Sequence, residues 1–178
     1  MRLGRAIIAI VALAALACGA GKSRAESVDS KYTLISAYIY NFTQLTTWPS
    51  SAMDDAFKVC VVGQDPFGAN LNPLKTRKVN DRKITVHHLG PTDSELASCN
   101  ALYVSGSETG NLKSILGAIR GTPVLTMSDI SGFSNQGGMV EFKLEEGKIG
   151  IWVALSAVRV TGLSISSKLL SLANMNIR

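Results

Sequence analysis

The alternation of short apolar runs with helical or turn segments is the feature that most limits how this chain can fold. The runs are rich in β-branched residues, which is typical of buried strands. Strands are expected over residues 57–62, 84–89, 101–104 and 123–127, with the segments 65–74, 93–97 and 109–120 between them. This order predicts βαβ units and a mainly parallel sheet. We therefore expect an α/β fold, a three-layer sandwich with helices on both faces of the sheet.

The segments on either side of this core are expected to add helices and a hairpin. Residues 26–48 carry apolar side chains at three- and four-residue spacing, which predicts an amphipathic helix that ends before Pro49. Residues 139–144 and 148–154 flank a glycine turn and predict a C-terminal antiparallel hairpin. Two further helical segments are expected over residues 155–160 and 164–175.

Residues 1–25 have the three parts of a secretory signal peptide. Arg2 and Arg5 supply the positive charge, an apolar stretch follows, and a small-x-small cleavage site ends at Ala25. We expect residues 26–178 to form a single exported domain. A retained membrane anchor is disfavoured because the apolar stretch is short. Lipid anchoring at Cys18 stays an alternative, since a single acyl chain would tether the domain without making it span the membrane.

Removing the signal segment changes the charge balance of the chain. Four of the 18 Lys and Arg residues and none of the 13 acidic residues lie in it, so 14 basic and 13 acidic residues remain, a formal charge of +1. A nearly neutral domain gives no broad electrostatic reason to bind nucleic acid or anionic lipid. We expect no nucleic-acid partner.

The exported domain keeps two cysteines, Cys60 and Cys99. In an oxidising compartment such a pair tends to form a disulfide, and two buried free thiols are the alternative. His87 and His88 are adjacent in an expected strand, so their side chains point to opposite faces and cannot hold one metal ion together. We expect no metal site and no cofactor.

Residues 63–68, GQDPFG, follow an expected strand and precede a helix, where doubly wound proteins bind phosphates. The segment lacks the glycine spacing of a dinucleotide site and the Lys-Ser/Thr of a phosphate loop. Asp65 as a helix cap, followed by Pro66, explains the segment without a ligand. We favour the capping interpretation.

Catalytic chemistry has weak support in this sequence. Ser105, Ser107 and Asp129 are candidates for an exported hydrolase, but the nucleophile turn Gly-x-Ser-x-Gly is missing and no complete catalytic set is recognisable. These residues are better explained as parts of loops at strand ends. We expect a protein that is not an enzyme.

Two other features leave alternatives open. Gly132-Phe133 and Gly137-Gly138 form either a loop that turns the chain or a close approach for another backbone or ligand. Trp152 lies in an expected strand with two apolar faces. Either helices cover both faces, or Trp152 belongs to an exposed recognition patch.

Taken in order, several motifs resemble the YfiR family, also described as YfiR/HmsC. They are AYIYNF at 37–42 with Trp48-Pro49, VCVVG at 59–63 with DPFG at 65–68, Cys99 before a strand, PVLT at 123–126 with Gly132-Phe133, GGM at 137–139, and residues 163–173. The resemblance covers essentially the whole exported domain.

The resemblance implies a regulatory function. Proteins of this family are periplasmic inhibitors that bind the periplasmic sensory domain of an inner-membrane diguanylate cyclase and hold it inactive. Release of the inhibitor permits cyclic-di-GMP synthesis and favours biofilm formation. An OmpA-like outer-membrane lipoprotein that sequesters the inhibitor, and a homodimer, belong to the same picture. Cys60 and Cys99 match the disulfide of the family, whereas a second cysteine pair near Gly137-Gly138 is missing.

Partner-binding residues do not follow from the motifs alone. Phe42, Trp48, Phe67 and Trp152 are the candidates, because an exposed aromatic side chain is a natural interface anchor. The alternative function is a periplasmic small-ligand binding module with a pocket at the carboxyl ends of the parallel strands, near residues 63–68 and 105–110.

Overall fold

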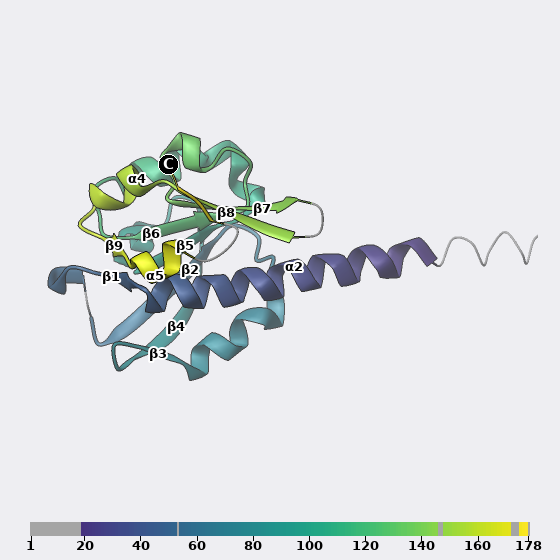
Figure 1. Ribbon diagram of the computed structural model, residues 1–178, viewed down its shortest axis with the longest axis horizontal. Coiled ribbons are helices and arrows are strands. Elements are labelled where there is room, and N and C mark those ends of the chain that lie inside the picture. The colour runs from purple at the N-terminus through teal and green to yellow at the C-terminus, as the bar shows by residue number, and fades with distance from the viewer. Residues whose placement is uncertain (1–18, 53, 146–147, 172–174, 178) are drawn as a thin grey trace, which may run out of the picture.

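The β-branched runs of the sequence form the parallel centre of a curled sheet (Figure 1). They are β2 (Ala56–Val62), β4 (Arg82–Leu89), β5 (Ala101–Val104) and β6 (Leu125–Ser128), paired in the order β4-β2-β5-β6. The structure, a computed structural model, describes residues 19–52, 54–145, 148–171 and 175–177. The expected α/β fold with a mainly parallel sheet is confirmed.

Antiparallel pairs occur toward both ends of the sheet. β7 (Val140–Glu145) runs parallel to β6 and antiparallel to β8 (Lys148–Val153), which confirms the expected hairpin. β10 (Met175–Ile177) then pairs in parallel with β8, and β3 (Lys78–Val79) pairs antiparallel with β4. The eight-stranded sheet therefore has the order β10-β8-β7-β6-β5-β2-β4-β3.

Helices lie on both faces of this sheet. The α-helices are α2 (Gly19–Gln44), α3 (Leu112–Ala118), α4 (Leu155–Arg159) and α5 (Ser167–Leu170). The 3-10 helices are η1 (Ser50–Ala52), η2 (Gly68–Thr76), η3 (Ser94–Ser98), η4 (Gly106–Asn111) and η5 (Ser134–Gln136). α2 lies along one face and its first turns project beyond the sheet (Figure 1).

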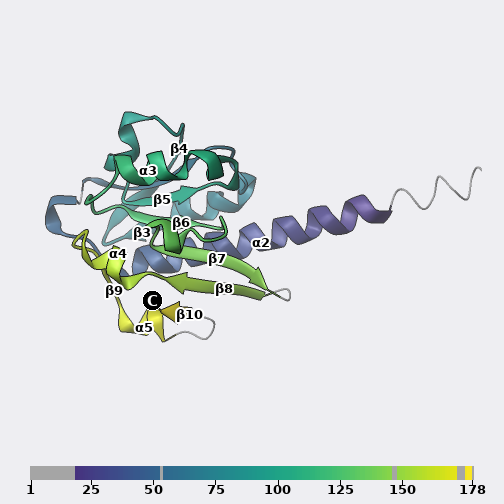
Figure 2. The same cartoon turned by 90° about the horizontal axis from the view of Figure 1, so that it is seen from above.

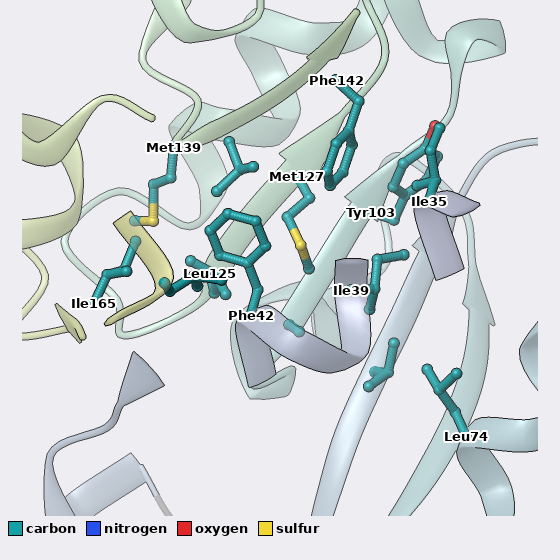
Figure 3. Packing of buried hydrophobic residues seen from close by; sticks show 14 of the residues in the cluster. Ile35, Ile39, Phe42, Leu74, Tyr103, Leu125, Met127, Met139, Phe142 and Ile165 are labelled. Carbon is teal, nitrogen blue, oxygen red and sulfur yellow. The ribbon is translucent and has the colours of Figure 1, made fainter. Parts of the chain in front are cut away.

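The larger core lies between α2 and the sheet (Figure 3). Ile35, Ile39 and Phe42 share the buried face of the helix and are each 0% exposed. Phe42 meets Phe142 of β7 edge to face, with ring centroids 6.4 Å apart. Burying a side chain of this size stabilises the fold by roughly 1.5–3 kcal/mol. The predicted apolar face of the first helix is thus the face that the sheet buries.

A second core covers the opposite face of the central strands. Val62 and Val104 point into it from β2 and β5, while Leu112 and Ile115 of α3 cover them. Val61, the neighbour of Val62, belongs to the α2 side. Successive residues of a strand point to opposite faces, so a continuous apolar run is what a sheet covered on both sides requires.

The first helix ends earlier than expected. α2 ends at Gln44 rather than at residue 48, because β1 (Thr46–Thr47) pairs antiparallel with β9 (Ser164–Ile165). The Ser166 N–H also donates to the Leu45 carbonyl at 2.8 Å. Pairing with a segment far away in the sequence therefore replaces the last expected turn of helix.

The expected helix over residues 164–175 is wrong. Its start is strand β9, its middle is the short helix α5, and Met175 begins strand β10. Ser166 caps α5, since its hydroxyl accepts a hydrogen bond from the Lys168 N–H at 3.3 Å. Within the described part of this segment, Leu169 of α5 is the residue of the predicted helical face that is fully buried, and Leu172 and Ala173 of that face lie outside the described residues.

Two findings concern membrane attachment. Among the described residues, no helix is both long and apolar enough to cross a bilayer. Residues 1–18, which include most of the expected signal peptide and Cys18, lie outside the described part of the chain. The signal peptide and the lipid-anchoring alternative stay predictions.

Substitution of Gly138 should destabilise the fold. A Cβ at this position would overlap the ring of Phe133, which is fully buried. Overpacking of this kind costs about 1–3 kcal/mol, so Gly138→Ala should lower the urea midpoint. Gly117→Ala in α3 is the matched control, because its Cβ would meet open space and should stabilise the helix by up to about 1 kcal/mol. Equal effects of both substitutions would contradict this packing.

Candidate functional site

Three of the four aromatic partner-binding candidates lie in the core. Phe42 is 0%, Phe67 2% and Trp48 6% exposed. The Trp48 Nε1–H donates to the Asn100 carbonyl at 3.2 Å, and its ring meets Phe57 edge to face. All three side chains therefore stabilise this domain and present little surface to another protein.

Trp152 is the candidate with accessible surface. It is partly exposed on β8, close to the sheet edge formed by β10. Its ring lies over Gly150, where a Cβ would contact the ring carbons. The Lys143 Nζ lies 4.2 Å from the Trp152 ring centroid, a distance at which a cation is attracted to the aromatic face. Trp152 is thus partly accessible, so its face of β8 is not fully covered, and its role in recognition stays a prediction.

The buried carboxylate of Glu141 lies beside Lys143 and fixes the position of that cation near Trp152. Glu141 is 1% exposed and pairs in register with Trp152. It accepts hydrogen bonds from the Gly132 N–H at 2.9 Å, and from the Ser134 N–H at 3.0 Å and hydroxyl at 2.6 Å. Its Oε1 lies 3.6 Å from the Lys143 Nζ. We call Glu141, Lys143 and Trp152 the Trp152 patch.

The charge of Glu141 follows from these contacts. Burial by itself would raise the pKa of Glu141, but hydrogen bonds from Ser134 and Gly132 and the Lys143 charge together hold that pKa below its ordinary value of 4.5. The carboxylate is therefore ionised at neutral pH. It fixes the loop that contains Gly132 and Phe133, so this stretch turns the chain, and it holds the Lys143 cation near Trp152.

The segment 63–68 is filled by the protein's own side chains. A Cβ on Gly63, which has a φ of +88°, would overlap Ser107 and Glu108. The Gln64 N–H donates to the Ser107 hydroxyl at 2.9 Å, and Asp65 accepts from the Phe67 N–H at 2.8 Å. The backbone N–H groups of Gln64 and Phe67 are thus used within the protein. The expected helix cap at Asp65 with Pro66 at the first helical position is wrong, because η2 begins at Gly68 after Phe67 and Asp65 closes a turn ahead of the helix.

Asp129 is the centre of a buried polar network. Its Oδ2 accepts from Lys31 Nζ at 2.5 Å and from the Tyr32 hydroxyl at 2.9 Å, and its Oδ1 accepts from the Tyr103 hydroxyl at 2.7 Å. Ser107, another candidate of the hydrolase alternative, donates to Glu108 at 3.2 Å. Asp129 therefore anchors α2 to the sheet and is not aligned with a nucleophile.

The protonation of this network follows from burial and charge. Burial, then the nearby Asp129 charge, raises the pKa of Tyr32 and of Tyr103 well above the usual 10.0. Burial would also raise the pKa of Asp129, but hydrogen bonds from Lys31 and Tyr103 hold it below 3.8. The network is thus a carboxylate held by one cation and two neutral phenols.

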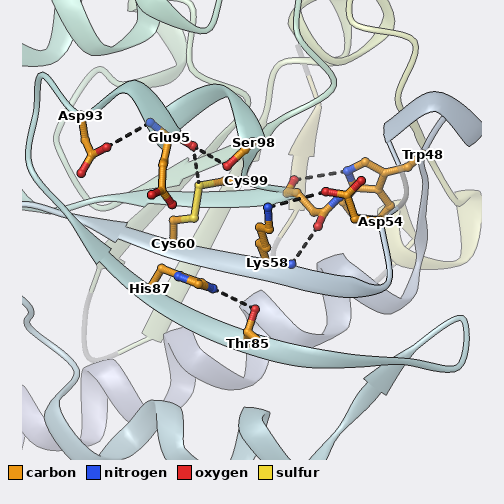
Figure 4. Close-up of a disulfide and its surroundings, with 11 residues drawn as sticks. Trp48, Asp54, Lys58, Cys60, Thr85, His87, Asp93, Glu95, Ser98 and Cys99 are labelled. Carbon is orange, nitrogen blue, oxygen red and sulfur yellow. Dashed lines mark hydrogen bonds and ion pairs between the residues drawn. A yellow bond between two sulfur atoms is a disulfide. The ribbon is translucent and has the colours of Figure 1, made fainter.

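Cys60 of β2 and Cys99, which precedes β5, form a disulfide (Figure 4). Their Cα atoms are 6.1 Å apart, and both side chains are buried. His87 lies beside Cys60 in register on β4 and its Nε2 is 2.9 Å from the Thr85 hydroxyl, whereas His88 is exposed. Within the described ranges, no three His, Cys, Asp or Glu side chains are placed to hold a metal ion.

The sequence did not predict which side chains contact Trp152 and Asp129. The predicted hairpin, with its turn at residues 145–147, would place Glu141 opposite Ile151, whereas the structure pairs Glu145 with Lys148 and thereby places Glu141 opposite Trp152. The contacts of Asp129 with α2 had no local signal, because Lys31 and Tyr32 lie almost one hundred residues earlier.

We compared the sequence with models of known protein families. The sequence model of the YfiR/HmsC-like family matches residues 32–174, which run from the sheet-covering part of α2 almost to β10. The chain belongs to the YfiR/HmsC-like family. This confirms the resemblance found in the sequence. No curated protein matches the chain.

Proposed function

We propose that this YfiR/HmsC-like protein is a periplasmic regulator. It binds the periplasmic sensory domain of an inner-membrane diguanylate cyclase and represses it, which lowers cyclic-di-GMP signalling and biofilm formation. The observation that carries the proposal is the family match over residues 32–174. The Cys60–Cys99 disulfide supports an oxidising compartment such as the periplasm.

The internal use of the polar groups also supports a regulatory rather than a catalytic function. Asp129 bonds to Lys31, Tyr32 and Tyr103, while Ser107 bonds to Gln64 and Glu108. At Gly63, in the segment expected to line a small-ligand pocket, Ser107 and Glu108 leave no room even for a Cβ. The contacts therefore favour a protein that acts by binding another protein.

Repression requires differential binding. The regulator holds the cyclase inactive only if it binds the inactive conformation of the sensory domain more tightly than the active one. A competing partner, such as an OmpA-like outer-membrane lipoprotein, would release the cyclase by sequestering the regulator through mass action. Homodimer formation would present two copies of the same surface.

The Trp152 patch is our candidate for the contact with the cyclase. Tryptophan is enriched among residues that dominate binding energies, and Lys143 and Gly150 keep the ring flat against the sheet. A side chain held in place before binding loses less conformational entropy in the complex. We therefore expect Trp152 to act as an anchor.

Trp152→Ala should weaken binding to the cyclase sensory domain by about 30-fold, the effect of losing about 2 kcal/mol. Calorimetric titration of the two purified proteins measures it. Leu144→Ala is the matched control, because Leu144 is 52% exposed on the same hairpin but points to the other face. If wild type binds and Trp152→Ala binds equally well, Trp152 is not the anchor. If folded wild type does not bind, the proposed function is wrong.

A further inference from the structure

A groove of about 620 Å³ lies between α3 and α4, separate from the Trp152 patch. Both helices can be followed in Figure 2. Its floor includes Val124 and Met139, and its walls carry Leu116 of α3 and Ala157 of α4. This interior is mostly apolar, so an occupant would have to present apolar side chains to it.

The rim of the groove is exposed and basic. Val160, at the end of α4, is 78% exposed. Lys113 of α3 and Arg120, in the turn that follows α3, are also exposed and line the groove, and the described lining contains no carboxylate. Neither basic side chain forms a hydrogen bond or an ion pair with any residue that the structure describes. Two cations beside an apolar floor are therefore available to an incoming partner.

The groove and the Trp152 patch lie on the same face of the sheet. Thr126 and Ser128 of β6 point to one face, because they are two residues apart in a strand. Thr126 lines the groove, while Ser128 pairs in register with Glu141, which in turn pairs with Trp152. One partner can therefore contact both places from the same side.

We propose that this groove receives an acidic, amphipathic segment of the cyclase sensory domain. Apolar side chains of the segment pack on Leu116 and Met139, and its carboxylates face Lys113 and Arg120. The inference rests on the proposed function and adds the surface and the chemistry of the partner segment. Complementary charge at the rim sets the orientation and raises the association rate.

Opposite charges introduced at Val160 test this chemistry most sharply. Because Val160 is exposed, Val160→Asp and Val160→Lys should both leave the fold intact. We expect Val160→Asp to weaken binding of the sensory domain by about tenfold through repulsion of the acidic segment, and Val160→Lys to bind at least as well as wild type. Thermal unfolding of both variants checks the fold.

Charge reversal at Lys113 and Arg120 is the second test of the groove proposal. The Lys113→Glu/Arg120→Glu variant should lose at least about tenfold in affinity and should lose most of the salt dependence of association. Lys168→Glu in α5 is the control, because Lys168 is exposed and lies outside the groove lining. If wild type binds, and Val160→Asp and Lys113→Glu/Arg120→Glu both bind as well as Val160→Lys and the Lys168→Glu control, the groove inference is wrong and the proposed function stands. If wild type fails to bind, both are wrong.

Discussion

Replacing Cys60 and Cys99 with serine should lower the free energy of unfolding by about 4 kcal/mol. The disulfide closes a loop between residues 39 apart in sequence, and the reduced unfolded chain gains the conformational freedom that this loop removes. A loss of this size is a large part of the stability of an ordinary domain. The bridge also ties β2 to the segment that enters β5, so the central strands should separate more easily without it.

Urea unfolding with and without a reducing agent measures the effect. Reduced wild type should match the Cys60→Ser/Cys99→Ser variant, and the reducing agent should leave that variant unchanged. Mass mapping of protein exported to the periplasm should find the two cysteines joined. Free thiols at both positions in folded, exported protein would contradict the structure.

Asp129→Asn should destabilise the protein by about 2–3 kcal/mol. Removing one partner of a buried ion pair usually costs 3–5 kcal/mol, and we expect less here because the Lys31 side chain is 22% exposed and can regain water. The substitution also leaves the buried Tyr103 hydroxyl beside a weaker acceptor. Asp55→Asn, at an exposed position, is the matched control and should change stability by less than about 0.5 kcal/mol. Equal stability of both variants would show that Asp129 does not anchor α2.

The same variant has a pH signature. The folded pKa values of Asp129 and Glu141 lie below their ordinary values of 3.8 and 4.5, so these carboxylates contribute stability above those values and lose it as pH falls through the folded pKa. Asp129→Asn should therefore flatten the acid side of the stability profile. The raised pKa values of Tyr32 and Tyr103 predict a second loss of stability above about pH 10, where unfolded tyrosine ionises.

Local patterns in the sequence predicted the layers of the fold. The spacing of Ile35, Ile39 and Phe42 identified the buried face of α2, and the β-branched runs identified the central strands. Both are properties of a helix or a strand that a neighbouring sheet or helix simply covers. The hairpin of β7 and β8 followed from its glycine turn in the same way.

Long-range pairing limited the prediction elsewhere. The helical spacing after Ser164 is overridden because this segment pairs with β1, more than one hundred residues earlier. Likewise, an aromatic residue carries no local mark of whether it is buried, so Phe42, Phe67 and Trp48 could not be told apart from Trp152. Phe42, Phe67 and Trp48 are buried because α2 packs on the sheet, and this packing is a tertiary contact that a local sequence pattern does not reveal.

Cyclase activity under control of the purified protein is the most direct test of the proposed function. A full-length diguanylate cyclase with a periplasmic sensory domain, whose gene neighbours that of this protein, is placed in vesicles with that domain accessible. We expect cyclic-di-GMP synthesis to fall and saturate as wild-type protein is added, and Trp152→Ala to need about 30-fold more protein for the same effect. Unchanged synthesis at saturating concentrations of folded, disulfide-bonded protein would contradict the account.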